Sequence, residues 1–189
     1  MAVHARGTFL VTRIATEVMA KLGNGGSIIN TSSIAGLKGN FGQTNYACAK
    51  AGIAGMTRVW GMELQRAGIR ANAIAPIAKT RMTEGIDQVA DELTPEMISP
   101  MVLFLASDLA KDVNGRIFGC HGTLLFEYRM EMTPGIEIEG GNWTASAIAD
   151  RMKELGELEH EKAGAAPAAA PAAGEMSTED KLAEVFGRM

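Results

Sequence analysis

Short strand-like segments alternate with helix-like segments along most of this chain. Three segments are short and begin at or just after glycine, as buried strands often do: 27–32, 68–76 and 115–120. Apolar residues recur at helical spacing in three others: 5–22, 45–66 and 95–109. Consecutive parallel strands need a crossover connection, which is usually a helix. The alternation therefore predicts an α/β fold with right-handed crossovers and a parallel sheet.

The two longer helical segments differ in their pattern. In 5–22, residues such as Val11, Ile14 and Val18 predict an amphipathic helix that ends at a Gly23 cap. In 45–66, small and apolar residues recur almost all round, which predicts a helix buried on most sides. Its many Ala and Gly residues permit close approach of another helix. We therefore expect 5–22 and 45–66 to form the interface of a homo-oligomer.

Composition excludes several classes of protein. The 189 residues allow one domain, or one plus a fragment, and 47% hydrophobic residues can bury a sizeable core. A net charge of −4 without a Lys/Arg block excludes the electrostatic footprint of a nucleic-acid-binding protein. No apolar run approaches the ~20 residues that span a bilayer, and 1–13 lacks a signal-peptide core. The cytoplasm is the expected compartment, with an organelle as the alternative. With only Cys48 and Cys120, neither a disulfide framework nor a metal site is expected.

The composition changes towards the C-terminus. Residues 161–176 are rich in Ala and Pro, which predicts a semi-extended linker without a core of its own. Residues 177–189 form a short amphipathic tail, and an isolated helix of that length is marginal in water. The main domain is therefore expected to occupy 1–160.

Ser33, Tyr46 and Lys50 form a constellation with recognisable chemistry. Ser33 follows the strand-like segment 27–32, and the other two lie one helical turn apart on one face. A tyrosine is a poor base at neutral pH because its unperturbed pKa is about 10. An ammonium group about 4 Å away favours the phenolate by about 4 kcal/mol at an effective dielectric constant of about 20. The spacing suits a tyrosine that exchanges a proton with an alcohol or ketone, and a serine that holds the substrate oxygen. The alternative is a helical surface pair and an unrelated loop serine.

Several segments resemble the short-chain dehydrogenase/reductase family, and the resemblance covers roughly 1–150. Asn30–Gly36 and Gly39–Gly52 are similar to its active-site segment almost position by position, and Asn72–Pro76 to its next strand. Further segments resemble the (3R)-hydroxyacyl-CoA dehydrogenases of the multifunctional type 2 class: Val3–Phe9, Arg81–Thr83 and Pro100–Leu103. The resemblance implies hydride transfer between NAD, or NADP, and a 3-hydroxyacyl or 3-oxoacyl thioester of the acyl-CoA type. It also makes the peroxisome a possible compartment in a eukaryote.

The same resemblance implies roles for individual residues. Tyr46 would be the catalytic acid or base, Lys50 would lower its pKa and hold the nicotinamide ribose, and Ser33 would orient the substrate oxygen. His4 stands where the wider family has an asparagine in a proton relay, so it is either a relay residue or a structural histidine. Two further residues are candidates to contact the nicotinamide amide: Ile77 and Thr80.

One family feature is missing from the sequence. No strand with a glycine-rich turn and helix precedes residue 27, and the glycines in 36–42 do not replace that turn because they lie between Ser33 and Tyr46. We therefore expect the C-terminal half of a doubly wound parallel-sheet Rossmann domain, with 27–32 as an open edge. The alternative to a dehydrogenase is a catalytically incompetent fragment that acts as an interaction module. The tail 177–189 is similar to the opening helix of a sterol-carrier-like domain.

Overall fold

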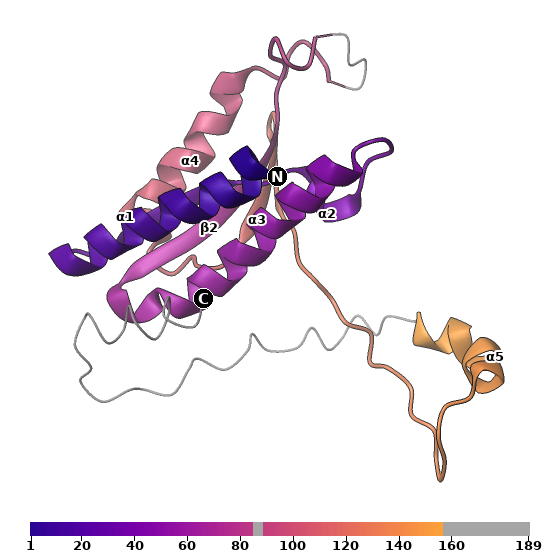
Figure 1. The fold of residues 1–189 in the computed structure, drawn as a ribbon. Coiled ribbons are helices and arrows are strands. Elements are labelled where there is room, and N and C mark those ends of the chain that lie inside the picture. The colour runs from indigo at the N-terminus through magenta and orange to yellow at the C-terminus, as the bar shows by residue number, and fades with distance from the viewer. Residues whose placement is uncertain (85–88, 157–189) are drawn as a thin grey trace. The chain divides into compact units, whose positions relative to one another are not determined.

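The computed structural model describes residues 1–84 and 89–156 (Figure 1). These residues fall into two compact units, one up to residue 128 and one over 129–156, which are described separately below. Both the expected linker 161–176 and the tail 177–189 lie outside the described residues. Among the helices of the described ranges, none is long and apolar enough to cross a membrane.

A four-stranded sheet forms the centre of the first unit. The strands are adjacent in chain order: β1 (Gly26–Thr31), β2 (Ile69–Ile77), β3 (Ile117–His121) and β4 (Leu124–Glu127). β1 pairs with β2, and β2 with β3, in parallel, whereas β4 turns back and pairs with β3 in antiparallel orientation. The predicted parallel α/β sheet is confirmed, β1 lies at one edge of the described sheet as expected, and β4 adds a strand that was not predicted.

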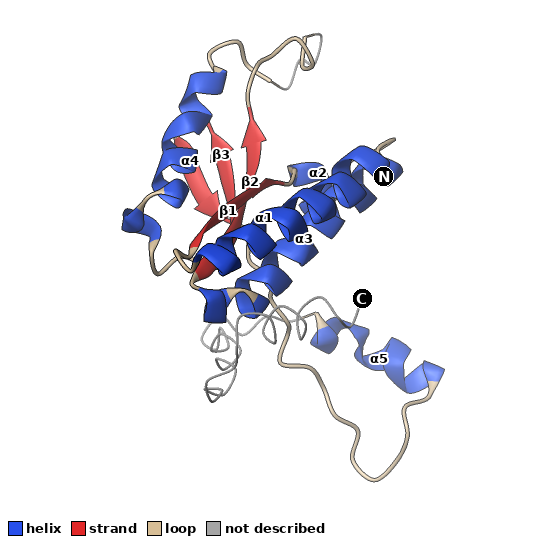
Figure 2. Cartoon of the chain, turned by 60° about the vertical axis from the view of Figure 1, so that its left-hand side comes forward, coloured by secondary structure: helices blue, strands red, loops and turns tan. Residues whose placement is uncertain are grey.

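Helices cover both faces of this sheet. α1 and α3 lie on one face and α4 on the other (Figure 2). Their bounds are α1 (Thr8–Leu22), α3 (Thr44–Glu63) and α4 (Ser99–Ala106). Successive side chains of β2 point to opposite faces of the sheet. Ile69 and Ala71 therefore pack with α1 and α3, whereas Ile74 packs with α4. The result is a three-layer sandwich with β2 in the middle of the core.

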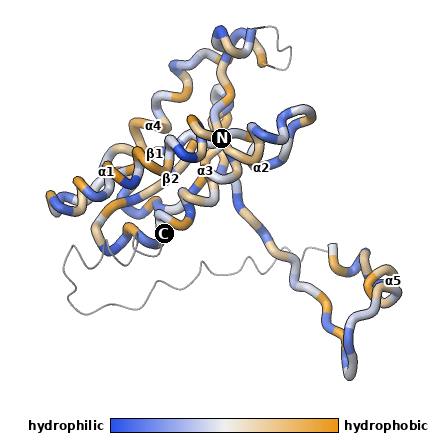
Figure 3. The backbone as a smooth tube through the Cα atoms, viewed as in Figure 1, coloured by the Kyte–Doolittle hydropathy of each residue, from blue (hydrophilic) through white to orange (hydrophobic). Residues whose placement is uncertain are grey.

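The apolar stripe of α1 is turned mostly outward, away from the sheet. The residues that it buries are Thr12, Thr16 and Ala20, whose small side chains let the helix lie close to the sheet. The Thr16 hydroxyl donates to the Thr12 carbonyl at 2.9 Å, which satisfies its polar group inside the helix. Hydrophobic residues recur along α1 (Figure 3). Its large apolar residues that are more than half exposed are Val11, Ile14, Val18 and Leu22. The predicted Gly23 cap is confirmed, with φ of 71°.

α3 is covered on one side only, so the prediction that it is buried on most sides is wrong. Its buried residues face the sheet and α1, whereas Ala51, Gly52 and Gly55 are exposed. The glycine-rich stretch 36–42, expected to be a loop, begins inside a short helix, α2 (Ile34–Lys38), which packs against α3.

The second unit contains α5 (Ala145–Leu155). The Thr144 hydroxyl caps this helix by accepting a hydrogen bond from the Ala147 amide at 3.2 Å. The Arg151 guanidinium lies 5.6 Å from the centroid of the Trp143 ring and donates to the Glu137 carbonyl at 2.8 Å. These contacts tie the start of α5 to its last turns and to the preceding segment.

Candidate active site

Ser33 lies directly after β1 and caps the N-terminus of α2. Its backbone is extended, with φ of −162° and ψ of 152°, and its Oγ accepts a hydrogen bond from the Ala35 amide at 3.2 Å. Within the described residues, no acceptor takes the Ser33 hydroxyl proton. The capping bond therefore fixes the oxygen and leaves its proton free to be donated to a ligand.

Tyr46 and Lys50 occupy the first turns of α3, as their spacing predicts. The Lys50 ammonium lies 5.7 Å from the centroid of the Tyr46 ring. Lys50 is only 7% exposed and donates from Nζ to the Thr31 carbonyl, at the end of β1, over 2.8 Å. Burial lowers the pKa of Lys50 because it disfavours the charged amine. The cation is thus held between the end of β1 and the tyrosine ring.

His4 lies at the same site, although it is far from Tyr46 in the sequence. It lies in a π-helix (Ala2–Gly7) that runs into α1. The His4 and Tyr46 rings meet edge to face, with their centroids 5.6 Å apart and their planes at 83°. π-Helical turns are often found at functional sites, where they redirect side chains. The structure thus brings His4, Tyr46 and Lys50 together, and Ser33 follows the strand whose last carbonyl binds Lys50.

Ile77 and Thr80 follow the carboxyl end of β2. Ile77 is its last residue, is half-buried and lies opposite His121 in the parallel register with β3. Thr80 is exposed, and its hydroxyl accepts a hydrogen bond from the Met82 amide at 3.2 Å. The carboxyl ends of parallel strands are where α/β sheets bind ligands, so Ile77 is at the expected edge. In the described structure, neither residue makes a hydrogen bond or ring contact with Tyr46 or Lys50.

Three neighbours that shape the site were not predicted: Thr31, Ser32 and Gly36. Thr31 acts through its carbonyl, which no side-chain pattern reveals. Gly36 lies against α3 so closely that an added Cβ would come within 2.5–2.7 Å of Lys50 and Ala51 atoms. Glycine permits this approach of two backbones. Its place in a glycine-rich stretch was the available signal, but that stretch was interpreted as a loop.

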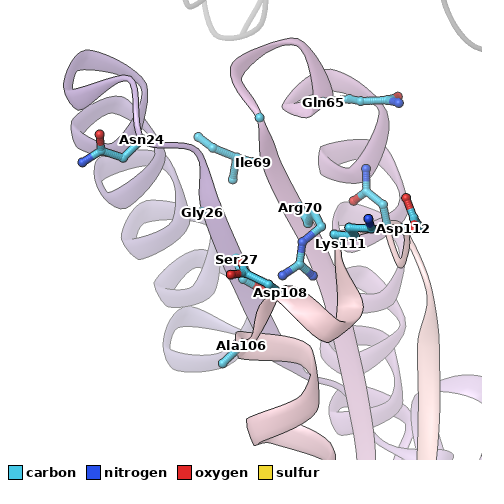
Figure 4. A pocket seen from close by; sticks show the side chains of 12 residues that line it. Asn24, Gly26, Ser27, Gln65, Ile69, Arg70, Ala106, Asp108, Lys111 and Asp112 are labelled. Carbon is cyan, nitrogen blue, oxygen red and sulfur yellow. The ribbon is translucent and has the colours of Figure 1, made fainter.

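A separate hollow lies at the other end of the strands (Figure 4). It has a volume of about 550 Å³ and is lined by residues at the amino ends of β1 and β2, such as Gly26 and Gly68, and by charged residues such as Asp108 and Lys111. Arg70 also lines it, but its guanidinium donates to two carbonyls at the C-terminus of α4, at 3.1 and 3.2 Å. This hollow mixes both charge signs and lies at the strand ends opposite to those that Ser33 and Tyr46 adjoin.

Comparisons with known proteins agree with this arrangement. The family model described as enoyl-(acyl carrier protein) reductase matches residues 1–122. The chain is 43% identical over 127 residues to human (3R)-3-hydroxyacyl-CoA dehydrogenase, covering 61% of this chain and 49% of that protein. It is 38% identical over 157 residues to mouse peroxisomal multifunctional enzyme type 2, covering 81% and 21% respectively.

Structural similarity supports the same assignment. A crystal structure of a short-chain dehydrogenase from Mycobacterium avium matches with a TM-score of 0.71 and 40% identity, covering 82% of this chain and 55% of that one. This chain spans about half the length of the short-chain dehydrogenases that it matches. The strand order, the position of Tyr46 and Lys50 on α3 and the matched residues lead to one conclusion: the chain belongs to the short-chain dehydrogenase/reductase family.

Proposed function

We propose that this chain carries the catalytic residues of an NAD-dependent dehydrogenase that acts on a 3-hydroxyacyl or 3-oxoacyl thioester. The observation that carries the proposal is the buried Lys50 ammonium beside the Tyr46 ring, fixed to the end of the strand that Ser33 follows. A cation held beside a tyrosine is placed to stabilise the negative charge that develops during proton transfer, which suits a tyrosine that acts as acid or base.

In the oxidation direction, the Ser33 hydroxyl donates a hydrogen bond to the C3 oxygen of the substrate, keeps its proton and orients that oxygen. Tyr46 takes the proton of that C3 hydroxyl as the C3–H bond gives up its hydride. Hydride transfer to or from C3 is the chemistry that a bound nicotinamide cofactor would supply. Lys50 keeps a positive charge beside Tyr46 in both directions, which lowers the cost of the phenolate. We assign His4 to the relay that returns the Tyr46 proton to solvent, since its ring contacts Tyr46 and is exposed.

The described residues fit the nicotinamide end of the cofactor. Lys50 presents a buried ammonium at the carboxyl edge of the sheet, which suits the ribose hydroxyls, together with the Tyr46 hydroxyl. We assign Ile77 and Thr80 to the nicotinamide amide. None of the strand-to-helix turns within 1–84 and 89–156 has the glycine-rich phosphate-binding pattern. We take NAD as the cofactor from the resemblance of the sequence to the (3R)-hydroxyacyl-CoA dehydrogenases, with NADP as the alternative.

The thioester carrier follows from the same relatives. The human relative is named for 3-hydroxyacyl-CoA, so an acyl-CoA is the preferred substrate, and an acyl carrier protein thioester is the alternative suggested by the family model. For the compartment we favour the cytoplasm, with the peroxisome as the alternative because one relative is a peroxisomal enzyme.

Turnover by the purified full-length chain tests this proposal. It is incubated with 3-hydroxybutyryl-CoA and NAD⁺, and NADH formation is followed by absorbance, with NADH fluorescence in the presence of the protein as the measure of cofactor binding. Substrate-dependent NADH formation supports the dehydrogenase. Neither NADH binding nor turnover at millimolar cofactor would favour the alternative, a catalytically incompetent fragment that acts as an interaction module. The exposed apolar side of α1 is the observation that supports that alternative.

Removal of the Lys50 charge provides a second test. Lys50→Met is expected to weaken NADH binding and lower kcat, about tenfold each, because one ammonium serves both the cofactor and Tyr46. The folded-state pKa of Lys50 lies below its unfolded value, so the charged amine disfavours folding below that pKa, and this cost disappears as the pH rises towards the unfolded value. The variant relieves this cost but also loses the hydrogen bond from Nζ to the Thr31 carbonyl, so its free energy of unfolding at pH 7 should stay within about 1–3 kcal/mol of the parent value. Thermal unfolding and fluorescence titration measure the two effects, and an unaltered NADH affinity contradicts the role of Lys50.

We also propose that the chain forms a homo-oligomer through α1 and α3. Val11, Ile14 and Val18 on α1 are 53–69% exposed, and Val59 and Met62 at the end of α3 are 42% and 57% exposed. Contiguous apolar surface of this kind marks interaction sites. Sedimentation equilibrium of the double variant Ile14→Glu/Val18→Glu should therefore give a monomer where the original chain gives a dimer or larger species. Leu109→Glu, at a leucine that is 82% exposed and lies outside both helices, is the matched control and should leave the assembly intact. A monomeric parent chain at 100 times its assay concentration overturns the proposal.

A further inference from the structure

Buried hydrogen bonds from polar side chains join the end of β1 to α3. Apolar packing is more usual where a helix covers a strand. Asn30 and Ser32 are alternate residues, so both point to the α3 side of the sheet. The Asn30 amide donates to the Thr57 hydroxyl at 2.9 Å, and the Ser32 hydroxyl donates to the Lys50 carbonyl at 2.8 Å. Asn30 and Ser32 are 6% and 2% exposed. Buried polar pairs of this kind fix one register between two elements, because any shift leaves the groups unpaired.

The segment 31–36 holds Lys50 at three points. The Thr31 carbonyl accepts from Nζ, the Ser32 hydroxyl binds the Lys50 carbonyl, and Gly36 lies against the Lys50 backbone and Cβ. The Ser32 amide in turn donates to the Ile74 carbonyl of β2 at 2.8 Å, so the segment is anchored to the sheet. Ser33 lies within this same segment. Its position is thereby coupled to that of the lysine.

We propose that Ser32 is a positioning residue for Lys50. Its hydroxyl sets the rotation and height of α3 on β1 at the residue that carries the ammonium, so that Nζ reaches the Thr31 carbonyl and stays beside Tyr46. Ser32 touches neither substrate nor cofactor in this role, and it acts through Lys50. The effect on turnover rests on the proposed function, whereas the effect on Lys50 itself does not.

A matched serine on the same strand makes this role testable. Ser27 donates to the Leu105 carbonyl of α4 at 2.8 Å, the same type and length of bond, but at the far end of β1 and on the other face. Ser27→Ala therefore removes a hydrogen bond of the same type and length without touching Lys50. Because Ser27 is half-buried and the Leu105 carbonyl keeps its hydrogen bond from Arg70, Ser27→Ala should lose no more thermal stability than Ser32→Ala, and each loss should correspond to about one hydrogen bond or less. The two variants should otherwise differ only in properties that depend on Lys50.

The reactivity of Lys50 is the first measurement. The folded full-length chain is treated with limiting acetic anhydride at a fixed pH, and acetylation of Lys50 is quantified by peptide mass spectrometry. In Ser32→Ala we expect Lys50 to react about fivefold faster, the factor that corresponds to one lost neutral hydrogen bond. Ser27→Ala should react at the original rate. Ser32→Cys, which keeps a weak donor of similar size, should give an intermediate rate and serves in place of the alanine variant if that variant does not fold.

Kinetics give the second measurement. Ser32→Ala should lower kcat and raise the KM for cofactor, about fivefold each, whereas Ser27→Ala should leave both unchanged. Equal Lys50 acetylation in the parent chain and the Ser32 variants overturns the proposal, because Ser32 is then an ordinary structural serine. If the parent chain shows no turnover, the proposed function fails, and the acetylation rates still decide the role of Ser32.

Discussion

Tyr46→Phe is expected to reduce turnover of a 3-hydroxyacyl thioester by about 10²–10⁴-fold, the usual contribution of a positioned acid or base. The phenyl ring keeps the edge contact with His4 and the packing near Lys50 but has no proton to exchange. Folding should therefore be unaffected. Steady-state kinetics with 3-hydroxybutyryl-CoA and NAD⁺, together with thermal unfolding, measure the two properties.

The chain provides its own control for this substitution, because it has two tyrosines. The Tyr128 hydroxyl is buried and has no hydrogen-bond partner in the described structure. Tyr128 packs in the same cluster as Leu37 and Ala54, but no hydrogen bond or ring contact in the described structure links it to Ser33, Tyr46 or Lys50. Tyr128→Phe removes the same atom from this residue, so kcat should stay at the original value. Loss of an unpaired buried hydroxyl should also leave stability unchanged or slightly higher. A Tyr46 variant with more than about a tenth of the original turnover contradicts the assignment of Tyr46 as acid or base.

Gly36→Ala is expected to destabilise the fold and to disturb the site together. The added Cβ would approach the Ala51 amide nitrogen at 2.5 Å and the Lys50 carbonyl carbon at 2.6 Å, and both are backbone atoms that cannot move aside alone. Overpacking of this kind costs about 1–3 kcal/mol of unfolding free energy. Because Ser33 caps α2 and Tyr46 lies on α3, separating the two helices by about 1 Å should also reduce kcat about 100-fold.

Gly52→Ala is the matched control for Gly36→Ala. Gly52 is two residues from Lys50, but a Cβ added there meets no atom within 4 Å. The free energy of unfolding should rise by up to about 1 kcal/mol, because alanine is the better helix former. Chemical denaturation of both variants separates the two outcomes. If Gly36→Ala and the parent chain have the same free energy of unfolding, α2 and α3 can move apart without loss of stability, and the prediction is contradicted.

The sequence predicted the order of the main elements because each carries its own local signal. Glycine before a short strand, helical periodicity and the Gly23 cap are all local, and each was found in the structure. β4 was missed because Leu124–Glu127 has only four residues, too few for a periodicity to stand out. α2 was missed because the glycines in 36–42 indicated a loop. The short helix forms there because Ser33 caps it and α3 packs against it.

The burial of helix faces could not be predicted from periodicity alone. In α1 the apolar stripe exists as expected, but close packing on the sheet selects the small side chains of Thr12, Thr16 and Ala20 for the buried face. The same limit applies to the site. The spacing of Tyr46 and Lys50 predicted their shared face, whereas the hold of the Thr31 carbonyl and Ser32 hydroxyl on Lys50 depends on where β1 ends against α3. Contacts between segments that are distant in the sequence leave no pattern of residues within either segment, so the sequence did not predict them.

The central place of β2 sets the order in which this sheet can assemble. Its two parallel neighbours reach it only through long crossovers, one with α2 and α3 and the other with α4. Closing such long loops lowers the conformational entropy of the chain before the strands pair and their contacts compensate for it. The rate of folding is therefore reduced. Only β3 and β4 are joined by a tight turn. We therefore infer that the β3–β4 hairpin can form early, and that the end of β1 meets Lys50 only after α3 has packed on β2, which makes the assembly of the site a late folding event.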